Sequence, residues 1–204
     1  DVPFSGEITG IETGKLKDGL RVGNWTIFHE NGQLDRKGNF KNGKKNGLWE
    51  WYFEEGKLAQ KLNFKDGLKE GLGLSFYTNG QISRTTNYSN GKQNGKTEVF
   101  HLNGQLAGKA YFVGGYRDGT WEEYFENGIL RKKSNYKQVP NCKSRLFYGC
   151  ENGITEEYYE NGNLHTRTNY KDGLIHGKLE YYYENGNLHT RTDYKDGLTH
   201  GRYE

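Results

Sequence analysis

Aromatic and apolar residues recur along this chain at a fixed period. A glycine returns every 24 residues, and each repeat position is counted from that glycine. An aromatic residue stands at +5 and again at +17, and a Leu or Ile stands at +11, in all seven repeats. A strict period of this length is typical of an array in which each unit packs on its neighbours. The period glycines are Gly23, Gly47, Gly71, Gly95, Gly119, Gly153 and Gly177.

Turn signals separate the apolar positions within each repeat. Gly stands at +9, usually after Asn, as in Asn31-Gly32, and a second turn signal follows as in Lys41-Asn42-Gly43. Asn-Gly between short apolar segments predicts a type I′ hairpin turn, because both residues tolerate the positive φ that this turn needs. Each repeat is therefore predicted as strand, tight turn, strand and looser turn, with strands near 24–30 and 34–40.

The predicted fold class is all-β. Successive hairpins are expected to stack into an elongated array that forms one continuous antiparallel twisted sheet. A helical alternative is disfavoured, since each of the thirty glycines would cost about 1 kcal/mol inside a helix. The period predicts a degenerate N-terminal capping repeat at 1–22, five repeats at 23–136, a Cys-containing insertion at 137–152, and two further repeats with the start of another at 153–204.

The two faces of the sheet are predicted from strand parity. Positions +11, +15 and +17 differ by even steps and share one face, which is expected to be the core. Position +6 is aromatic or His in every repeat and points away from +5. Together with Trp at +2 and +4, it predicts an aromatic stripe on the outer face, either as a binding surface or as a structural ladder. The candidate binding residues are Trp25, Trp49, Trp51, Phe53, Tyr77, Trp121, Phe125, Tyr159 and Tyr183.

The repeat motif resembles a known family. Tyr-Tyr-Glu-Asn-Gly-Asn-Leu, then Asn-Tyr-Lys-Asp-Gly, then the period glycine, at 158–177, resembles the MORN repeat in its bacterial variant form. The resemblance covers 23–204 apart from the insertion. It implies a β-hairpin array without catalytic residues. MORN arrays serve as protein-interaction or membrane-lipid-associating modules, and the variant also occurs in proteins described as antitoxins and in surface or secreted proteins.

Composition and charge narrow the partner class. Aliphatic residues are few, but 16 Tyr and 4 Trp supply apolar area for an ordered fold. The formal net charge is only +3, with both signs interspersed, so there is no electrostatic footprint for nucleic acid. No apolar run approaches the roughly 18 residues of a membrane span, so membrane association is not indicated.

No catalytic or cofactor constellation stands out. Four histidines are repeat copies, in the pairs His165 with His189 and His176 with His200. The two members of each pair lie two strands apart, which is too far for them to bind one metal ion. His29 and His101 stand at +6 and are interpreted as polar-tipped aromatics. Glutamates recur at +3 and +7 near Lys or Arg at +13 and +14, which predicts charged cross-strand ladders. We therefore expect no enzyme activity and no cofactor.

Cys142 and Cys150 are the only cysteines, and both lie in the insertion. Eight positions apart, they are expected to form a local disulfide, which implies an oxidising compartment; two free thiols in a reducing cytosol are the alternative. The preferred function is a repeat scaffold that binds a protein or glycan partner and is secreted, periplasmic or on a bacterial cell surface. The alternative is a cytoplasmic antitoxin or immunity-type protein that occludes a toxin.

Overall fold

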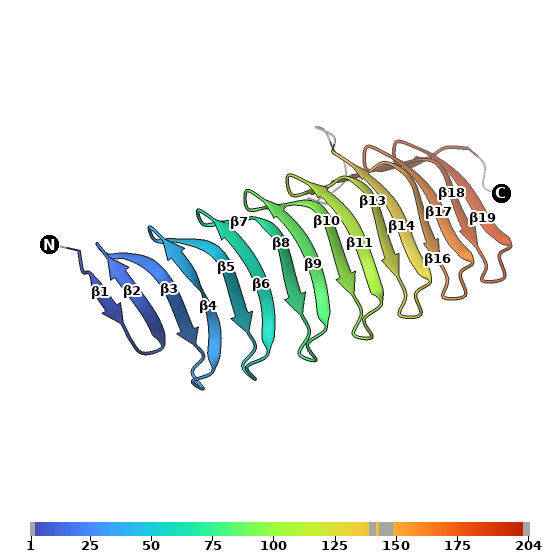
Figure 1. Ribbon diagram of the computed structural model, residues 1–204. Helices are drawn as coiled ribbons and strands as arrows, with labels where there is room; N and C mark the ends of the chain where they lie inside the picture. Colours follow the sequence, from blue (N-terminus) through green and yellow to red (C-terminus); the bar gives the residue numbers. More distant parts are fainter. Residues whose placement is uncertain (1–2, 139–141, 143–148, 202–204) are drawn as a thin grey trace. The chain divides into compact units, whose positions relative to one another are not determined.

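A computed structural model describes residues 3–138, 142 and 149–201 of the chain, and these contain strands and turns without any helix (Figure 1). The chain divides into two compact units, unit 1 at Asp1–Lys92 and unit 2 at Gln93–Glu204. Each unit is a row of antiparallel hairpins in which long strands pair with the strand before and the strand after them in the row. The prediction of an all-β hairpin array is confirmed.

Unit 1 begins with two short strands and continues with regular hairpins. β7 and β8 both pair with β6, so they are two segments of one interrupted strand position. The strands are β1 Gly6–Ile8, β2 Glu12–Lys17, β3 Leu20–Phe28, β4 Leu34–Lys41, β5 Lys44–Tyr52, β6 Leu58–Lys65, β7 Leu68–Lys69, β8 Gly71–Phe76 and β9 Ile82–Ser89.

Unit 2 repeats this pattern on both sides of the insertion. β14 pairs with both β15 and β16, so the ladder resumes directly after the insertion. The strands are β10 Lys92–Phe100, β11 Leu106–Val113, β12 Tyr116–Arg117, β13 Gly119–Tyr124, β14 Leu130–Lys137, β15 Cys150–Glu151, β16 Gly153–Tyr158, β17 Leu164–Lys171, β18 Leu174–Tyr182, β19 Leu188–Lys195 and β20 Leu198–Thr199.

The prediction of which turn in each repeat is tight and which is looser is wrong. The Asn42-Gly43 turn is the tight one: Lys41 pairs directly with Lys44, and both turn residues have positive φ, 51° and 75°. The turn at +6 to +10 is longer, because Phe28 pairs with Leu34 across five residues. In it only Gly32 has positive φ, and the Asn31 side chain instead accepts a hydrogen bond from the Gln33 amide. The Asn-Gly signal at +8 and +9 therefore belongs to a wider turn.

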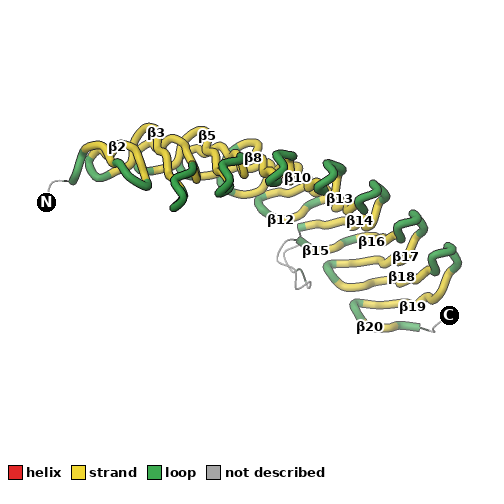
Figure 2. The backbone as a smooth tube through the Cα atoms, turned by 90° about the horizontal axis from the view of Figure 1, so that it is seen from below, coloured by secondary structure: helices red, strands yellow, loops and turns green. Residues whose placement is uncertain are grey.

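Both rows of turns connect neighbouring repeats. The Gly43 amide donates to the Arg21 carbonyl at 3.0 Å, and Gly67 donates to Lys45 in the same way. On the other side, the Asn31 side-chain amide donates to the Glu54 carbonyl. Figure 2 shows successive loops following one another beside the strands of unit 2, where equivalent bonds recur. Within each unit, bonds of these two kinds connect neighbouring repeats at both ends of the strands.

The period glycine is fixed by its backbone conformation. Gly47 has φ of 78°, and a Cβ at this position would meet nothing within 4 Å. A side chain would have room there but would occupy a backbone region that L-residues avoid. Opposite it, the register between β4 and β5 shifts at Gly38. The recurring glycine therefore marks an irregularity at which each repeat joins the preceding one.

The core consists of large side chains at +2 fitted against small residues at +15 of the preceding repeat. A Cβ on Gly38 would collide with the Trp49 ring, and one on Gly14 would collide with Trp25. The exception at +15, Leu62, has the opposite arrangement, because its side chain lies over Gly73 at +2 of the next repeat. Large and small residues therefore alternate between neighbouring repeats so that their volumes match.

Candidate functional site

The sheet of unit 1 has two faces of different chemistry. Trp49 and Glu50 are adjacent in β5, so their side chains point to opposite faces. The rings of Phe40 and Trp49 meet edge to face at 4.9 Å, and those of Trp49 and Trp51 lie 5.9 Å apart. We call the first surface the aromatic face of unit 1. It carries Trp25, Phe40, Trp49, Trp51 and Phe64.

The other surface, here called the ladder face, carries glutamates that are each held by several partners. Glu50 accepts from Lys37 at 3.1 Å, Lys61 at 3.0 Å and the Tyr52 hydroxyl at 3.0 Å. The Lys61 hydrogen bond is the largest cause that lowers the pKa of Glu50 to about 2. The carboxylate of Glu50 is therefore an anion with a fixed structural role.

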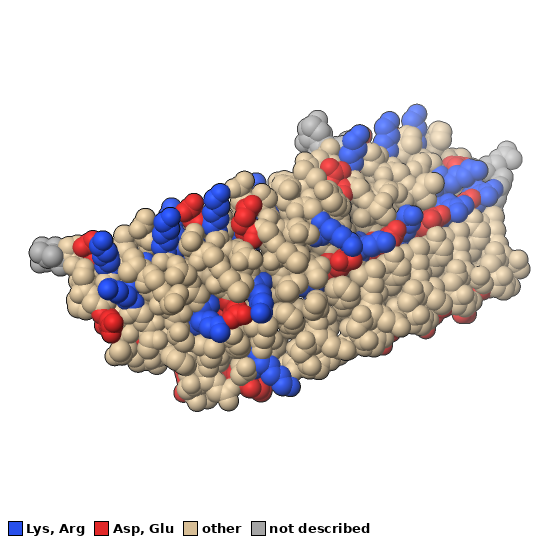
Figure 3. All heavy atoms as spheres, in the orientation of Figure 1, with Lys and Arg blue, Asp and Glu red and all other residues tan. Residues whose placement is uncertain are grey.

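The ladder recurs in unit 2. Glu122 binds Lys109 at 2.7 Å and accepts from the Tyr124 hydroxyl, and Glu180 binds Arg191 at 2.8 Å. Figure 3 shows positive and negative side chains alternating in a row across the strands of this unit. The prediction of cross-strand ladders is confirmed for the +3 glutamates Glu50, Glu122, Glu156 and Glu180, whose cationic partners stand at +14.

Cations lie over the rings of the aromatic face. The Lys45 ammonium is 4.4 Å from the centre of the Trp49 ring, 4.7 Å from Trp51 and 5.2 Å from Phe64. The Arg21 guanidinium is 4.4 Å from the Trp25 ring. In such contacts the negatively polarised face of the aromatic ring attracts the cation. Each +2 tryptophan is thus covered by a cation that stands four residues earlier in the sequence.

Two cations on the aromatic face of unit 1, Lys45 and Lys69, have no carboxylate partner among the described residues. Arg21 is paired with Glu12 at 2.6 Å. In the part of unit 1 that the structure describes, no carboxylate lies within ion-pair distance of Lys45 or of Lys69, whose ammonium is 5.0 Å from the Tyr88 ring. Burial and the positive charges of Arg36 and Lys69 lower the pKa of Lys45. The aromatic face of unit 1 therefore carries an excess of positive charge.

The corresponding face of unit 2 carries more acidic side chains. Arg117 lies 3.6 Å from the Trp121 ring, as the cations of unit 1 do, but glutamates occupy +4 in place of Trp51. Glu157 pairs with Lys132 at 3.0 Å, and Glu123 pairs with Arg131 at 3.5 Å. Arg117 itself contacts the Tyr136 hydroxyl rather than a carboxylate, so it shares with Lys45 and Lys69 the lack of a carboxylate partner among the described residues.

The prediction that the +2 tryptophans form an exposed stripe is wrong. Trp25 is 2% exposed and Trp49 is fully buried. Each fits against a glycine of the preceding repeat, and the Trp49 indole donates to the Asn39 carbonyl at 3.0 Å. Trp51 and Trp121 are partly buried on the same face as +15 and +17, which was predicted to be the core face.

The +6 residues do not extend this stripe either. The strand ends at +5, and the +6 residue begins the five-residue turn. In the second repeat this residue is Phe53, whose amide donates to the Lys57 carbonyl. The Tyr159 hydroxyl donates to the Tyr182 carbonyl of the next repeat at 2.9 Å. Tyr183 is half exposed and lies against His189. The +6 row also includes Tyr77 and Phe125, both partly buried.

A sequence signal for this arrangement was present and was missed. Wherever +2 is Trp, the +15 residue of the preceding repeat is Gly or Ala, as in the pair Ala110 and Trp121, and a cation stands four residues before the Trp. The first regularity indicates packing between repeats, and the second indicates cation–π contacts. Together they would have placed the tryptophans in the core.

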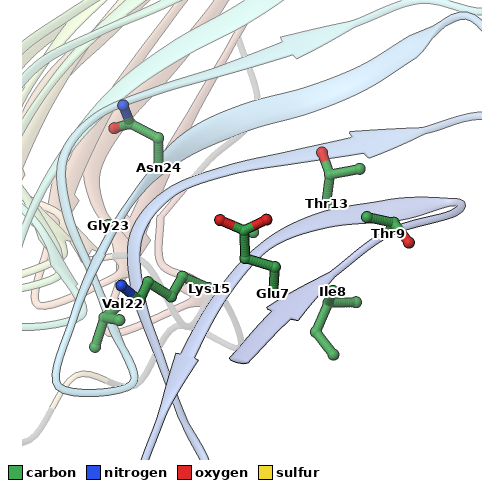
Figure 4. Close-up of a pocket in the computed structure, with 9 residues that line it drawn as sticks. Glu7, Ile8, Thr9, Thr13, Lys15, Val22, Gly23 and Asn24 are labelled. Carbon is green, nitrogen blue, oxygen red and sulfur yellow. The ribbon is translucent and has the colours of Figure 1, made fainter. Parts of the chain in front are cut away.

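A hollow at the N-terminal end of unit 1 has no evident chemistry. Its volume is about 420 Å³, and Figure 4 shows Glu7, Thr13, Lys15 and Asn24 around it. Glu7 and Lys15 are solvent-exposed, so water screens their charges. Within the described residues, no group of three or more His, Cys, Asp or Glu side chains could hold a metal ion.

The cysteines form the predicted disulfide between Cys142 and Cys150. Cys150 is fully buried at the start of β15, which pairs with Lys137 of β14. The bond thus joins the insertion to the hairpin array. Most of the remaining insertion residues lie outside the described part of the chain. A disulfide is typical of proteins in oxidising compartments.

The fold and this surface define a β-hairpin repeat scaffold with one cation-bearing aromatic face. The chain belongs to the MORN repeat family: the MORN repeat variant model matches it seven times, at residues 21–42, 45–66, 69–90, 93–113, 117–138, 151–172 and 175–196. This confirms the resemblance seen in the sequence. Repeats of this family are non-enzymatic scaffolds that commonly bind proteins or membranes. A search of curated proteins finds no match to this chain. No helix in the described residues is long and apolar enough to cross a bilayer.

Proposed function

We propose that this chain is a non-enzymatic scaffold that binds a protein partner through the aromatic face of unit 1. The observation that carries the proposal is the cluster of partly buried Trp51 and Phe64 under the Lys45 ammonium, which has no carboxylate partner. Tryptophan and other aromatic side chains are enriched in binding hot spots. Trp25 and Trp49 form the buried floor of this surface, and the groups above them are accessible.

A protein partner fits this surface better than a glycan. Sugars stack on open ring faces, whereas the rings here are covered by Lys45 and Arg21. The disulfide supports an exported bacterial protein, in the periplasm or on the cell surface, over the cytoplasmic antitoxin alternative. Binding without turnover agrees with carboxylates that are engaged in structural ladders, such as Glu50.

Peptide selection against the full chain tests the proposal. Phage-displayed random peptides are selected on the protein, and the binders are measured against Trp51→Leu, which keeps an apolar side chain and preserves the fold. The matched control is Tyr111→Leu, which changes a ring that is 52% exposed in unit 2. We expect Trp51→Leu to weaken binding by about tenfold, a loss of roughly 1.4 kcal/mol, and Tyr111→Leu to leave it unchanged. Absence of any selected binder, or equal binding to both variants, contradicts the proposal.

A further inference from the structure

We propose that the partner segment is an acidic polyproline II stretch with a carboxylate at every third residue, which crosses the strands of unit 1 along Arg21, Lys45 and Lys69. The inference rests on the proposed function and specifies the chemistry of its partner. It follows from the spacing of these cations, from the missing counter-charges of Lys45 and Lys69, and from the rings beneath them.

The spacing sets the period of the partner. The three cations occupy the same repeat position, on β3, β5 and β7, with one strand between each pair. Two strand steps are about 9–10 Å. A polyproline II helix advances about 9.3 Å per turn of three residues, so every third side chain returns to the same side at that interval. In an extended β-strand every third side chain would instead alternate between opposite sides. A threefold helix with a carboxylate at every third residue therefore presents one carboxylate to each cation.

The charge of the face determines the sign of the partner. Lys45 and Lys69 have no carboxylate partner among the described residues, and Glu50 of the same repeat is engaged with Lys37 and Lys61 on the ladder face. In unit 2, Glu123 and Glu157 of the equivalent face pair with Arg131 and Lys132, which stand at other repeat positions. A bound acidic segment would supply the carboxylates that Lys45 and Lys69 lack. Complementary charge also fixes the register of such a segment.

The rings suit the conformation of the segment. Polyproline II ligands dock in shallow grooves lined by aromatic side chains, since their backbone forms no internal hydrogen bonds and is already extended. Trp51 and Phe64 lie 6.1 Å apart, and Tyr88 lies beneath Lys69 in the next repeat. These rings lie beneath the cations and are only partly buried, so a segment bound along the cations would contact their exposed edges.

Defined peptides test both the charge and the spacing. Binding of the full, disulfide-intact chain is measured by fluorescence anisotropy at low salt. The first probe is a labelled peptide of repeated Glu-Pro-Pro triplets. The second has the same composition with all glutamates at one end, and the third has Gln in place of Glu. We expect the triplet peptide to bind about tenfold more tightly than either of the others.

Charge-matched variants locate the site. The double variant Lys45→Gln with Lys69→Gln should weaken triplet binding about tenfold. The control Lys41→Gln with Lys65→Gln removes the same charge from two exposed turn lysines of unit 1 and should leave binding unchanged. Lys45→Arg should retain binding. Melting curves of all variants establish that each is folded.

The outcomes separate this inference from the proposed function. Equal binding of the Glu and Gln peptides, no binding of either, or equal loss in both double variants would overturn the acidic-segment inference. Peptides selected by phage display would still support a protein-binding face in that case. Anionic phospholipid vesicles and heparin are measured in parallel. If either binds through Lys45 and Lys69 while the triplet peptide does not, the partner is a membrane or a sulfated glycan and the inference is wrong.

Discussion

Single tryptophans form a core in this protein because a neighbouring repeat leaves space for them. Trp49 is fully buried in a sheet with no helix packed on it among the described residues, since Gly38 lies directly against its ring and Lys45 covers it. The indole nitrogen is also satisfied, by the Asn39 carbonyl. At the residue scale, burial therefore depends on a glycine eleven positions earlier and a lysine four positions earlier.

Truncation of a buried tryptophan should be strongly destabilising. We expect Trp49→Ala to lower the free energy of unfolding by about 3–5 kcal/mol, because it leaves a cavity and removes contacts of Phe40 and Lys45. The exposed control Tyr111→Ala should change it by less than about 0.5 kcal/mol. Chemical denaturation followed by circular dichroism measures both. A similar, small effect of the two substitutions would contradict the assignment of Trp49 to the core.

Glu50 should make stability fall in acid. The pKa of Glu50 in the folded protein is about 2, below the ordinary value of 4.5, because the folded state favours the anion. The resulting stabilisation is present above pH 4.5 and is lost as the pH falls from 4.5 toward 2. We expect Glu50→Gln to reduce this acid-dependent loss in melting temperature. The control is Glu54→Gln, which changes an exposed turn glutamate. An unchanged pH profile in Glu50→Gln would count against the ladder.

At the scale of elements, the strands are connected by turns whose Asn residues serve different purposes. Asn42 adopts positive φ in a two-residue turn. Asn31 does not, and its side chain bonds the Gln33 amide and the Glu54 carbonyl of the next repeat. The same Asn-Gly dipeptide thus sets a backbone conformation in one turn and supplies side-chain hydrogen bonds in the other.

Glycine substitutions should distinguish the two turns. Asn42→Gly is expected to be nearly neutral, because Gly adopts positive φ freely and no side-chain bond of Asn42 is required. Asn31→Gly should destabilise by about 1–2 kcal/mol, since it removes two hydrogen bonds. Thermal melting of the two variants gives the comparison. If Asn42→Gly were the more damaging substitution, the turn assignment would have to be reversed.

At the scale of the whole chain, neighbouring repeats within each unit are bonded to one another, and the disulfide lies within unit 2. β14 pairs with both β15 and β16, which lets the array continue past the insertion. The Cys142–Cys150 bond closes a loop within unit 2. In an array of this kind, stability is approximately a sum of repeat and nearest-neighbour terms. A change at the disulfide should consequently remain near it.

Reduction of the disulfide should have a small and local effect. Closing so short a loop stabilises by about 2–3 kcal/mol at most. We expect hydrogen exchange to accelerate in β14, β15 and β16 of the reduced protein, while β3 to β6 of unit 1 remain unchanged. Intact mass with thiol alkylation establishes the oxidised state first. Two free thiols in protein purified from its native compartment, or loss of protection throughout the chain, would contradict this expectation.

The sequence by itself determined the all-β class, the hairpins, their period and the disulfide. These depend on local chemistry that recurs: turn residues, aromatic positions at +5 and +17, and two cysteines eight residues apart. The tertiary structure decided which turn is tight and which side of the sheet the tryptophans occupy. Strand parity could not settle this, since the strand ends at +5 and the space for Trp49 is made by Gly38 on another strand. The unpaired charge of Lys45 likewise depends on the tertiary structure, which places the carboxylate of Glu50 on the opposite face of the sheet.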